Sequence, residues 1–353
     1  MKLSPIPTDP TSVAQVFPES LAHVVRGRKV YDTSSSPEAR VYRVDMDDRR
    51  LFIKTSSQGT LSAEATMTRY VHGLGLSGEV VLYETLPTPD SSSGNGVTQR
   101  DWLITGAVSG SDCTDDTYLA DPERLCEMMA DILHLLSEQP VHGCPVAHRT
   151  DDYLTHAWNR CSRMLSDMKE DDNPNRHDGP VDGIPHGALF DVHYYTNRFG
   201  DASVQDIAEV LRRYRHSLTT DTLIHGDFCL PNIILDHWRF SGFVDLGGSG
   251  VGDRHIDVFW ALWTLQYNLK THEHDDRFLD AYGRDRIDPD ALRAVAAAEV
   301  FSRQADNDHY VRSGGSCRSA ALPSRRRATW SMPSERHFFS PTLRDAACLQ
   351  ICH

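Results

Sequence analysis

The 353-residue chain has few lysines and no long apolar segment. Lysine occurs at only five positions, which are Lys2, Lys29, Lys54, Lys169 and Lys270. No apolar run is long enough to cross a bilayer, and residues 1–18 contain no signal-peptide core. The formal net charge is -14, so the chain lacks the excess of basic residues that nucleic-acid-binding proteins use. We therefore expect a cytoplasmic protein with a cationic small-molecule partner and neither a nucleic-acid nor a membrane partner.

Several motifs that would indicate other chemistry are also absent. Cysteines before residue 302 form no C-x-x-C pair, which favours reduced thiols over a disulfide framework. No lysine follows a glycine, so there is no Walker A loop, and there is no G-x-S-x-G elbow. The glycine-rich residues 247–252 lack the later acid of a dinucleotide-binding fingerprint. His272 and His274 stand two residues apart, which is the wrong spacing for zinc ligands on one helix face.

Residues 1–107 are predicted to form a small lobe of antiparallel sheet with one helix. Residues 1–30 are interpreted as a poorly specified leader with one short amphipathic segment, 13–25. A helix is predicted over 61–73, and a polar loop over 87–96. Strands are predicted at 40–45, 50–55, 80–83 and 102–105.

Helical patterns dominate residues 108–301, beyond a hinge expected at 106–110. The helices are predicted at 122–138, 151–169, 204–214, 256–269, 277–282 and 289–301. Residues 302–353 differ from the rest, with eight arginines, four acids and no sustained period. This composition predicts a disordered or loosely packed basic tail, with an interaction arm as the alternative.

One stretch holds two acids and an amide in the order that phosphoryl transfer requires. Asp227 lies in a short loop, Asn232 begins an apolar run five residues later, and Asp245 ends the next apolar run. Protein kinases use this order: the Asp meets the substrate hydroxyl and the Asn binds metal. Two adjoining strands would bring Asn232 and Asp245 together as hard oxygen ligands for Mg²⁺. The pattern predicts Asp227 as the catalytic acid and the other two residues as metal ligands.

A lysine and a glutamate from the first lobe complete this set. Lys54 ends an apolar strand, and Glu64 lies on the helix that follows. A Lys–Glu pair that orients the α and β phosphates of ATP belongs to the same mechanism. The structural alternatives are a turn-capping role for Asp227, an edge-strand lysine and a helix-surface glutamate. The spacing from Asp227 to Asn232 and Asp245 favours the catalytic interpretation.

On these residues the chain resembles the aminoglycoside phosphotransferase family, most closely its 3'-phosphotransferase (kanamycin kinase) branch. The resemblance covers about residues 30–301 and rests on LFIKT at 51–55, CP at 144–145, HGDFCLPN at 225–232 and SGFVDLG at 241–247. It implies an α+β, protein-kinase-like fold with a small antiparallel sheet lobe and a larger, mainly helical lobe. It also implies Mg²⁺-dependent transfer of the γ-phosphate of ATP to a hydroxyl, the 3'-OH, of an aminoglycoside antibiotic, which gives resistance.

The resemblance also implies roles for individual residues. Phe52 would stack on adenine, although a core position is an equal alternative, and the backbone of Thr105 and Ala107 would bond the adenine edge. Ser35 would lie over the phosphates. Glu299, in a weak match to the family's acidic C-terminal residues, would bind substrate amines.

Three departures from the family leave two other functions open. Gly248 stands where the family usually has arginine, no acidic cluster precedes residue 225, and 52 residues follow Phe301, where the family normally ends. This extension is either an evolved addition or a read-through or frame-shifted segment. The alternatives are a kinase of the same fold with another hydroxyl acceptor and an inactive nucleotide-binding homologue. The sequence does not indicate the oligomeric state.

Overall fold

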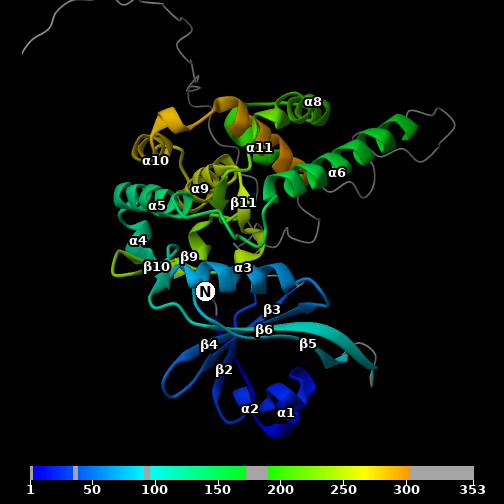
Figure 1. The fold of residues 1–353 in the computed structure, drawn as a ribbon, viewed down its shortest axis with the longest axis vertical. Coiled ribbons are helices and arrows are strands. Elements are labelled where there is room, and N and C mark those ends of the chain that lie inside the picture. The colour runs from blue at the N-terminus through cyan, green and yellow to red at the C-terminus, as the bar shows by residue number, and fades with distance from the viewer. Residues whose placement is uncertain (1–2, 35–38, 91–95, 172–189, 303–353) are drawn as a thin grey trace, which may run out of the picture. The chain divides into compact units, whose positions relative to one another are not determined.

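The computed structural model describes residues 3–34, 39–90, 96–171 and 190–302. Ser35 and residues 303–353 lie outside these ranges. The first lobe is a six-stranded antiparallel sheet in the order β1-β2-β3-β4-β6-β5. Its strands are β1 (Ser4–Ile6), β2 (Lys29–Asp32), β3 (Arg40–Asp45), β4 (Arg50–Ser57), β5 (Val80–Asp90) and β6 (Gly96–Gly106). The helix α3 (Ser62–Gly73) lies beside this sheet, as Figure 1 shows.

The N-terminal residues are folded, where the sequence predicts a poorly specified leader. They form β1, α1 (Pro10–Val16), a short 3-10 turn η1 (Glu19–Leu21) and α2 (Ala22–Val25). Asp9 caps α1 by accepting from the N–H groups of Thr11 and Ser12 at 3.1 Å. Four apolar side chains at four-residue spacing are buried with the sheet: Val13, Phe17, Leu21 and Val25. These four side chains span the amphipathic segment 13–25, whose apolar face packs against the sheet.

The β5–β6 hairpin is longer than the sequence predicts. Residues 87–90 continue β5, although a polar loop was expected over 87–96. Pro87 and Pro89 are compatible with a strand here because β5 is at the edge of the sheet, where a missing N–H breaks no ladder bond on the open side. The buried Trp102 Nε1 donates to Thr88 Oγ1 at 2.9 Å and joins the two strands.

The second lobe is mainly helical and is organised around α9. Most side chains of this helix are buried, and it packs with α5, α10 and α11 in one large core. Ser203 and Asp206 form a capping box at the start of α8. The helices are α4 (Asp116–Leu119), α5 (Pro122–Ser137), α6 (Arg149–Asp171), α7 (His193–Phe199), α8 (Val204–Tyr214), α9 (Arg254–Leu269), α10 (Asp275–Tyr282) and α11 (Pro289–Ser302).

Short strands in this lobe position the predicted motif. β9 (Ile233–Asp236) and β10 (Arg239–Phe243) form a hairpin that also pairs with β7 (Ser111–Asp112), and β8 (Thr222–Ile224) pairs with β11 (Gly250–Gly252). The segment with Asp227 and Asn232 therefore connects β8 to β9, and Asp245 follows β10. Among the described helices, none is long and apolar enough to cross a membrane.

Candidate active site

Asp227 and Asn232 are hydrogen-bonded to each other in the loop between β8 and β9. The Asn232 amide Nδ2 donates to Asp227 Oδ2 at 3.0 Å and to the Asp227 carbonyl at 2.9 Å. The Cys229 thiol donates to the other carboxylate oxygen, Oδ1, at 3.2 Å. Because the amide nitrogen Nδ2 donates to Asp227, the amide oxygen Oδ1 of Asn232 is the atom that a metal would use.

A buried carboxylate on α9 braces the same loop. Asp257 is fully buried and accepts from the backbone N–H groups of His225 at 2.7 Å and Gly226 at 2.8 Å. Burial raises the pKa of Asp257 to about 7, with the two N–H donors opposing the shift. His225 accepts from the Asp227 N–H at Nδ1, and its Nε2 lies 3.0 Å from the Val244 carbonyl. Burial lowers the pKa of His225, so the ring is neutral with its proton on Nε2.

Glycine is required where this loop meets the turn after Asp245. Gly226 has φ +80°, and a Cβ atom there would lie 2.1 Å from the Gly248 carbonyl oxygen. The two backbones therefore approach each other more closely than any side chain would allow. Asp245 itself is left-handed, with φ 58° and ψ 58°, directly before the turn η4 (Leu246–Gly248). Such strain in a residue other than glycine is typical of functional sites.

Lys54 joins the sheet lobe to this site. Its Nζ lies 2.8 Å from Glu64 Oε2 and 2.9 Å from Asp245 Oδ1. Burial alone would lower the pKa of Lys54, but the charges of Asp245 and Glu64 outweigh it and raise that pKa. The Lys54 charge lowers the pKa of Asp245, while burial raises the pKa of Glu64. The Asp245 side chain is 51% exposed, against 10% for Glu64, so Asp245 is the carboxylate that presents an open oxygen.

Arg149 contributes to the site without having been predicted. From the start of α6, its guanidinium donates to the carbonyls of Gly247 at 3.0 Å and Ser249 at 2.9 Å. It therefore holds the turn at which Gly248 replaces the arginine expected from the family. Burial lowers the pKa of Arg149. The only sequence signal was its position shortly after Cys144-Pro145, which says nothing about where its side chain points.

A pocket opens beside the loop between β8 and β9. It has a volume of about 310 Å³, and the backbone of Gly226 and Gly248 forms part of its wall. Asp152 and His156 on α6 are exposed and line it, so it presents a carboxylate to solvent. The remaining lining residues are Arg149, Tyr153, Ile224, Ile256 and Ser302.

Glu299 is not placed as a substrate ligand. Its side chain on α11 is buried, with 3% of the residue exposed, and Oε1 accepts from Tyr153 Oη at 2.9 Å and Trp260 Nε1 at 3.2 Å. The expectation that Glu299 binds a substrate amine is therefore corrected. The helix α11 buries almost every side chain that follows Pro289, so its acid lies inside the lobe.

The expected adenine contact of Ala107 also needs correction. The Ala107 N–H donates to the Arg50 carbonyl at 3.0 Å, so it is used within the sheet lobe. Thr105 is paired with Phe52 on β4 and with Val80 on β5. In an antiparallel pair, hydrogen-bonded and non-hydrogen-bonded residue pairs alternate, and the Ala107–Arg50 hydrogen bond fixes which pairs are which. Thr105 and Phe52 are then a hydrogen-bonded pair, so the backbone groups of Thr105 point toward Phe52. The Phe52 side chain is half-buried on β4. The Ala107 N–H is therefore not free to bond a nucleotide, whereas the expected contact of the Thr105 backbone stays a prediction.

The donors near Asp245 suit Mg²⁺ rather than a protein-only metal cage. Within the described ranges, no group of three or more His, Cys, Asp or Glu side chains could hold a metal ion. Asn232 and Asp245 are linked through the Val244 N–H, which donates to the Asn232 carbonyl at 3.0 Å. Mg²⁺ is usually bound by one or two carboxylates together with water and substrate phosphates, so one amide oxygen and one exposed carboxylate fit it.

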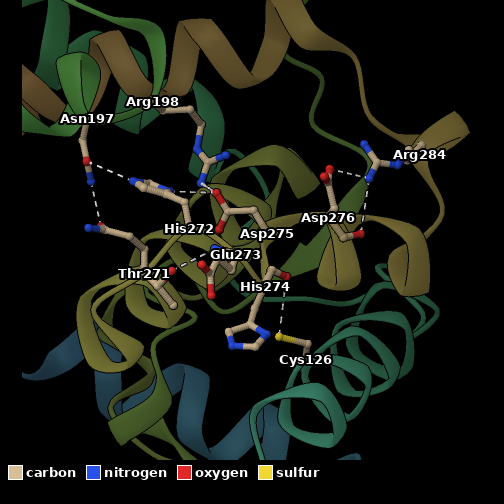
Figure 2. A network of polar contacts seen from close by, with 11 residues as sticks. Cys126, Asn197, Arg198, Thr271, His272, Glu273, His274, Asp275, Asp276 and Arg284 are labelled. Carbon is tan, nitrogen blue, oxygen red and sulfur yellow. Dashed lines mark hydrogen bonds and ion pairs between the residues drawn. The ribbon is translucent and has the colours of Figure 1, made fainter. Parts of the chain in front are cut away.

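The two histidines of the α9–α10 loop serve structural roles. His272 Nδ1 lies 2.8 Å from Asp275 Oδ2, which also accepts from Arg198 of α7 at 3.0 Å. Figure 2 shows His272 directed toward this network and His274 directed toward Cys126, away from it. The two rings point in different directions, and the network ties α7 to α10.

Comparison with known proteins places this geometry in a family. A model of the phosphotransferase enzyme family matches residues 34–296. The chain belongs to this family. It is 37% identical over 285 residues to a probable aminoglycoside 3'-phosphotransferase of Lactococcus lactis, covering 81% of this chain and 95% of that protein. It is 25% identical to an aminoglycoside 3'-phosphotransferase of Streptomyces fradiae, covering 83% of this chain and 99% of the relative.

The fold of this family member agrees with that of a solved relative. The crystal structure of an aminoglycoside-3'-phosphotransferase of type VIII superposes with a TM-score of 0.57 at 21% identity, covering 80% of this chain and 96% of that one. The expected protein-kinase-like α+β fold and the predicted membership of the phosphotransferases are thus confirmed.

Proposed function

We propose that this phosphotransferase moves the γ-phosphoryl group of ATP to the 3'-hydroxyl of an aminoglycoside, in the cytoplasm, and thereby confers resistance. The observation that carries the proposal is the contact of Lys54 with both Glu64 and Asp245, next to the loop that holds Asp227. The relatives in Lactococcus lactis and Streptomyces fradiae, both described as 3'-phosphotransferases, support the choice of acceptor and of hydroxyl.

In this proposal the chain's own residues act mainly by positioning and by charge. Asp227 accepts a hydrogen bond from the acceptor hydroxyl and orients it for attack. Lys54, fixed by Glu64, contacts the α and β phosphates. Asn232 and Asp245 would hold magnesium, whose positive charge offsets the charge that develops on the phosphates.

The pocket beside Gly226 and Gly248 is the proposed acceptor site. Gly226 in its wall directly precedes Asp227, so the pocket adjoins the loop that holds Asp227. Its exposed acid, Asp152, provides a partner for an ammonium group of the substrate. With Glu299 buried, Asp152 replaces it as the proposed amine-binding acid.

The test is ATP-dependent phosphorylation of kanamycin by the full-length chain. Asp227→Ala should abolish turnover and leave the Kd for MgADP within about twofold, because Asp227 is assigned to the acceptor and not the nucleotide. Asp236→Ala, an exposed acid at the end of β9, is the matched control and should behave as wild type. Survival of kanamycin phosphorylation in Asp227→Ala would refute the assignment of Asp227.

Two further arms separate the alternatives. A 3'-deoxy aminoglycoside should bind but not be phosphorylated if the 3'-hydroxyl is the acceptor. Turnover on a different hydroxyl compound, with none on aminoglycosides, would favour a kinase of another substrate. MgADP binding without turnover on any acceptor would favour an inactive homologue.

A further inference from the structure

Asp101 is a buried carboxylate in β6, outside the set of residues assigned to the reaction. It is fully buried. Its Oδ1 accepts from Thr85 Oγ1 at 2.8 Å, and its Oδ2 accepts from Tyr83 Oη at 3.1 Å and from the Leu61 N–H at 3.0 Å. Burial alone would raise the pKa of Asp101, but the hydrogen bonds from Thr85, Gly59 and Leu61 outweigh it and lower that pKa. The Asp101 carboxylate is thus a charged, fully hydrogen-bonded group inside the first lobe.

The hydrogen bond from Leu61 to Asp101 lies at the start of α3. Leu61 occupies the N-cap position of this helix, and its own side chain makes no capping bond. The first N–H groups of a helix need acceptors, and a negative charge near them is favourable because of the helix dipole. The Asp101 carboxylate, reaching across from β6, supplies both. Leu61 also packs with Ala65 and Leu103 in a small buried cluster, so apolar contacts and a charged hydrogen bond hold the same turn.

The turn that Asp101 holds is the one that carries Glu64. Glu64 lies three residues after Leu61, in the first turn of α3, and bonds Lys54 at 2.8 Å. Lys54 is itself paired with Leu103 of β6, two residues after Asp101. Both partners of the Lys54–Glu64 pair are therefore fixed to the same short stretch of one strand: Lys54 through the β4–β6 ladder and Glu64 through the start of α3.

We infer that Asp101 is a positioning residue: by fixing the first turn of α3 to β6, it holds Glu64 against Lys54 and thereby sets the affinity for the nucleotide. The inference rests on the proposed nucleotide role of Lys54. Asp101 touches neither nucleotide nor acceptor in this scheme. Its loss acts on the nucleotide side of the reaction, through the geometry of the Lys54–Glu64 pair.

The test is calorimetric measurement of the Kd for MgADP, which needs no acceptor. Asp101→Asn keeps the shape but offers one acceptor oxygen in place of two, and should raise the Kd about tenfold, as expected for a weakened charged hydrogen bond. The KM for the aminoglycoside should stay unchanged. Tyr83→Phe, which removes one donor and is tolerated more easily, should shift the Kd in the same direction by about twofold.

A matched control separates positioning from stability. Thr88→Val removes the acceptor of Trp102 in the same hairpin and should lower the Tm without changing the Kd for MgADP, because the Thr88 hydroxyl is bonded to Trp102 and to the Leu86 carbonyl. A double variant with Glu64→Gln adds a second readout. If Asp101 acts through Glu64, Asp101→Asn raises the Kd no further once Glu64 is replaced, while the Tm losses add.

The outcomes distinguish this inference from the proposed function. Failure of the wild-type chain to bind MgADP would count against the proposed function. Wild-type binding with an unchanged Kd in both Asp101→Asn and Tyr83→Phe would overturn the inference alone. Independent, multiplicative effects of Asp101→Asn and Glu64→Gln on the Kd would overturn it as well.

Discussion

The ammonium group of Lys54 lies 2.9 Å from the Asp245 carboxylate, although the two residues are 191 positions apart in the chain. Lys54 comes from the sheet lobe, and Asp245 follows the β9–β10 hairpin. A single positive charge thus faces two carboxylates, because Glu64 lies on its other side. Removing this charge leaves two acids close together with no counter-charge, which is unfavourable at a partly buried site.

We expect Lys54→Met to reduce kcat/KM for ATP about a hundredfold, the size seen when one charge-stabilising donor is lost from an active site. The Kd for MgADP should rise in parallel. Lys270→Met is the control, since Lys270 directly follows α9 with its Nζ over the Tyr267 ring and has no part in the site. Equal kinetics in the two variants would remove Lys54 from the mechanism.

The buried Asp257 predicts a pH dependence of stability. Its pKa is raised to about 7 by burial, above the value of an unfolded aspartate. The folded state therefore binds the extra proton between about pH 4 and 7, and its stability falls as the pH rises through that window. Relative to Asp257→Asn, the wild-type free energy of unfolding should fall between pH 5 and 7, by on the order of a few kcal/mol, and level off above pH 7. Urea unfolding at four pH values measures this.

Asp253→Asn is the control for that experiment. Burial would raise the pKa of Asp253, but its bonds with His255 and Thr219 outweigh this and hold it below the ordinary value. A lowered pKa gives stability that is lost only in acid, below the pH 5 to 8 range. Asp253→Asn should therefore destabilise by the same amount at every pH tested. A difference between wild type and Asp257→Asn that does not change between pH 5 and 7 would show that Asp257 is ionised throughout that range.

The close approach of Gly226 to Gly248 predicts a loss of activity in Gly226→Ala. A Cβ atom would meet the Gly248 carbonyl oxygen, and the positive φ adds strain of about 1–3 kcal/mol. Because the loop must move, we expect kcat to fall about a hundredfold, as misplacement of catalytic groups by 1 Å can cause. Gly200→Ala also places alanine at a positive φ, 84°, but in open space. It should lose stability and keep kcat; an equal fall in kcat would assign the effect to strain alone.

Much of the site was predictable because it is local in sequence. Asp227, Asn232 and Asp245 lie within one loop and one hairpin, where spacing alone fixes which side chains meet. The helix α8 begins and ends as predicted, since its capping box and apolar spacing both lie within the segment. Lys54 and Glu64 are ten residues apart and meet across a strand and the helix that follows.

The remaining parts depend on contacts between distant segments. The acid of Glu299 faces Trp260 and Tyr153 only because α11 is surrounded by other helices. The Ala107 N–H is used by Arg50 only because of the β4–β6 register. Arg149 approaches the turn after Asp245 from about 100 residues away. A single sequence carries no signal for such pairings. A sequence pattern therefore predicts ligand-binding roles for Glu299 and Ala107, although their polar groups form hydrogen bonds within the fold.

Asp152 is exposed in the pocket, whereas Glu299 is buried in α11. Asp152→Asn should raise the KM for kanamycin about tenfold, the size of one charge-assisted hydrogen bond, and leave kcat and the Kd for MgADP unchanged. The neighbouring Asp151→Asn is the matched control, because Asp151 is also exposed but does not line the pocket. Glu299→Gln should lower the Tm and leave the KM for kanamycin unchanged, since its carboxylate is used by Tyr153 and Trp260. The reverse result, a raised KM in Glu299→Gln and none in Asp152→Asn, would return the amine-binding role to Glu299.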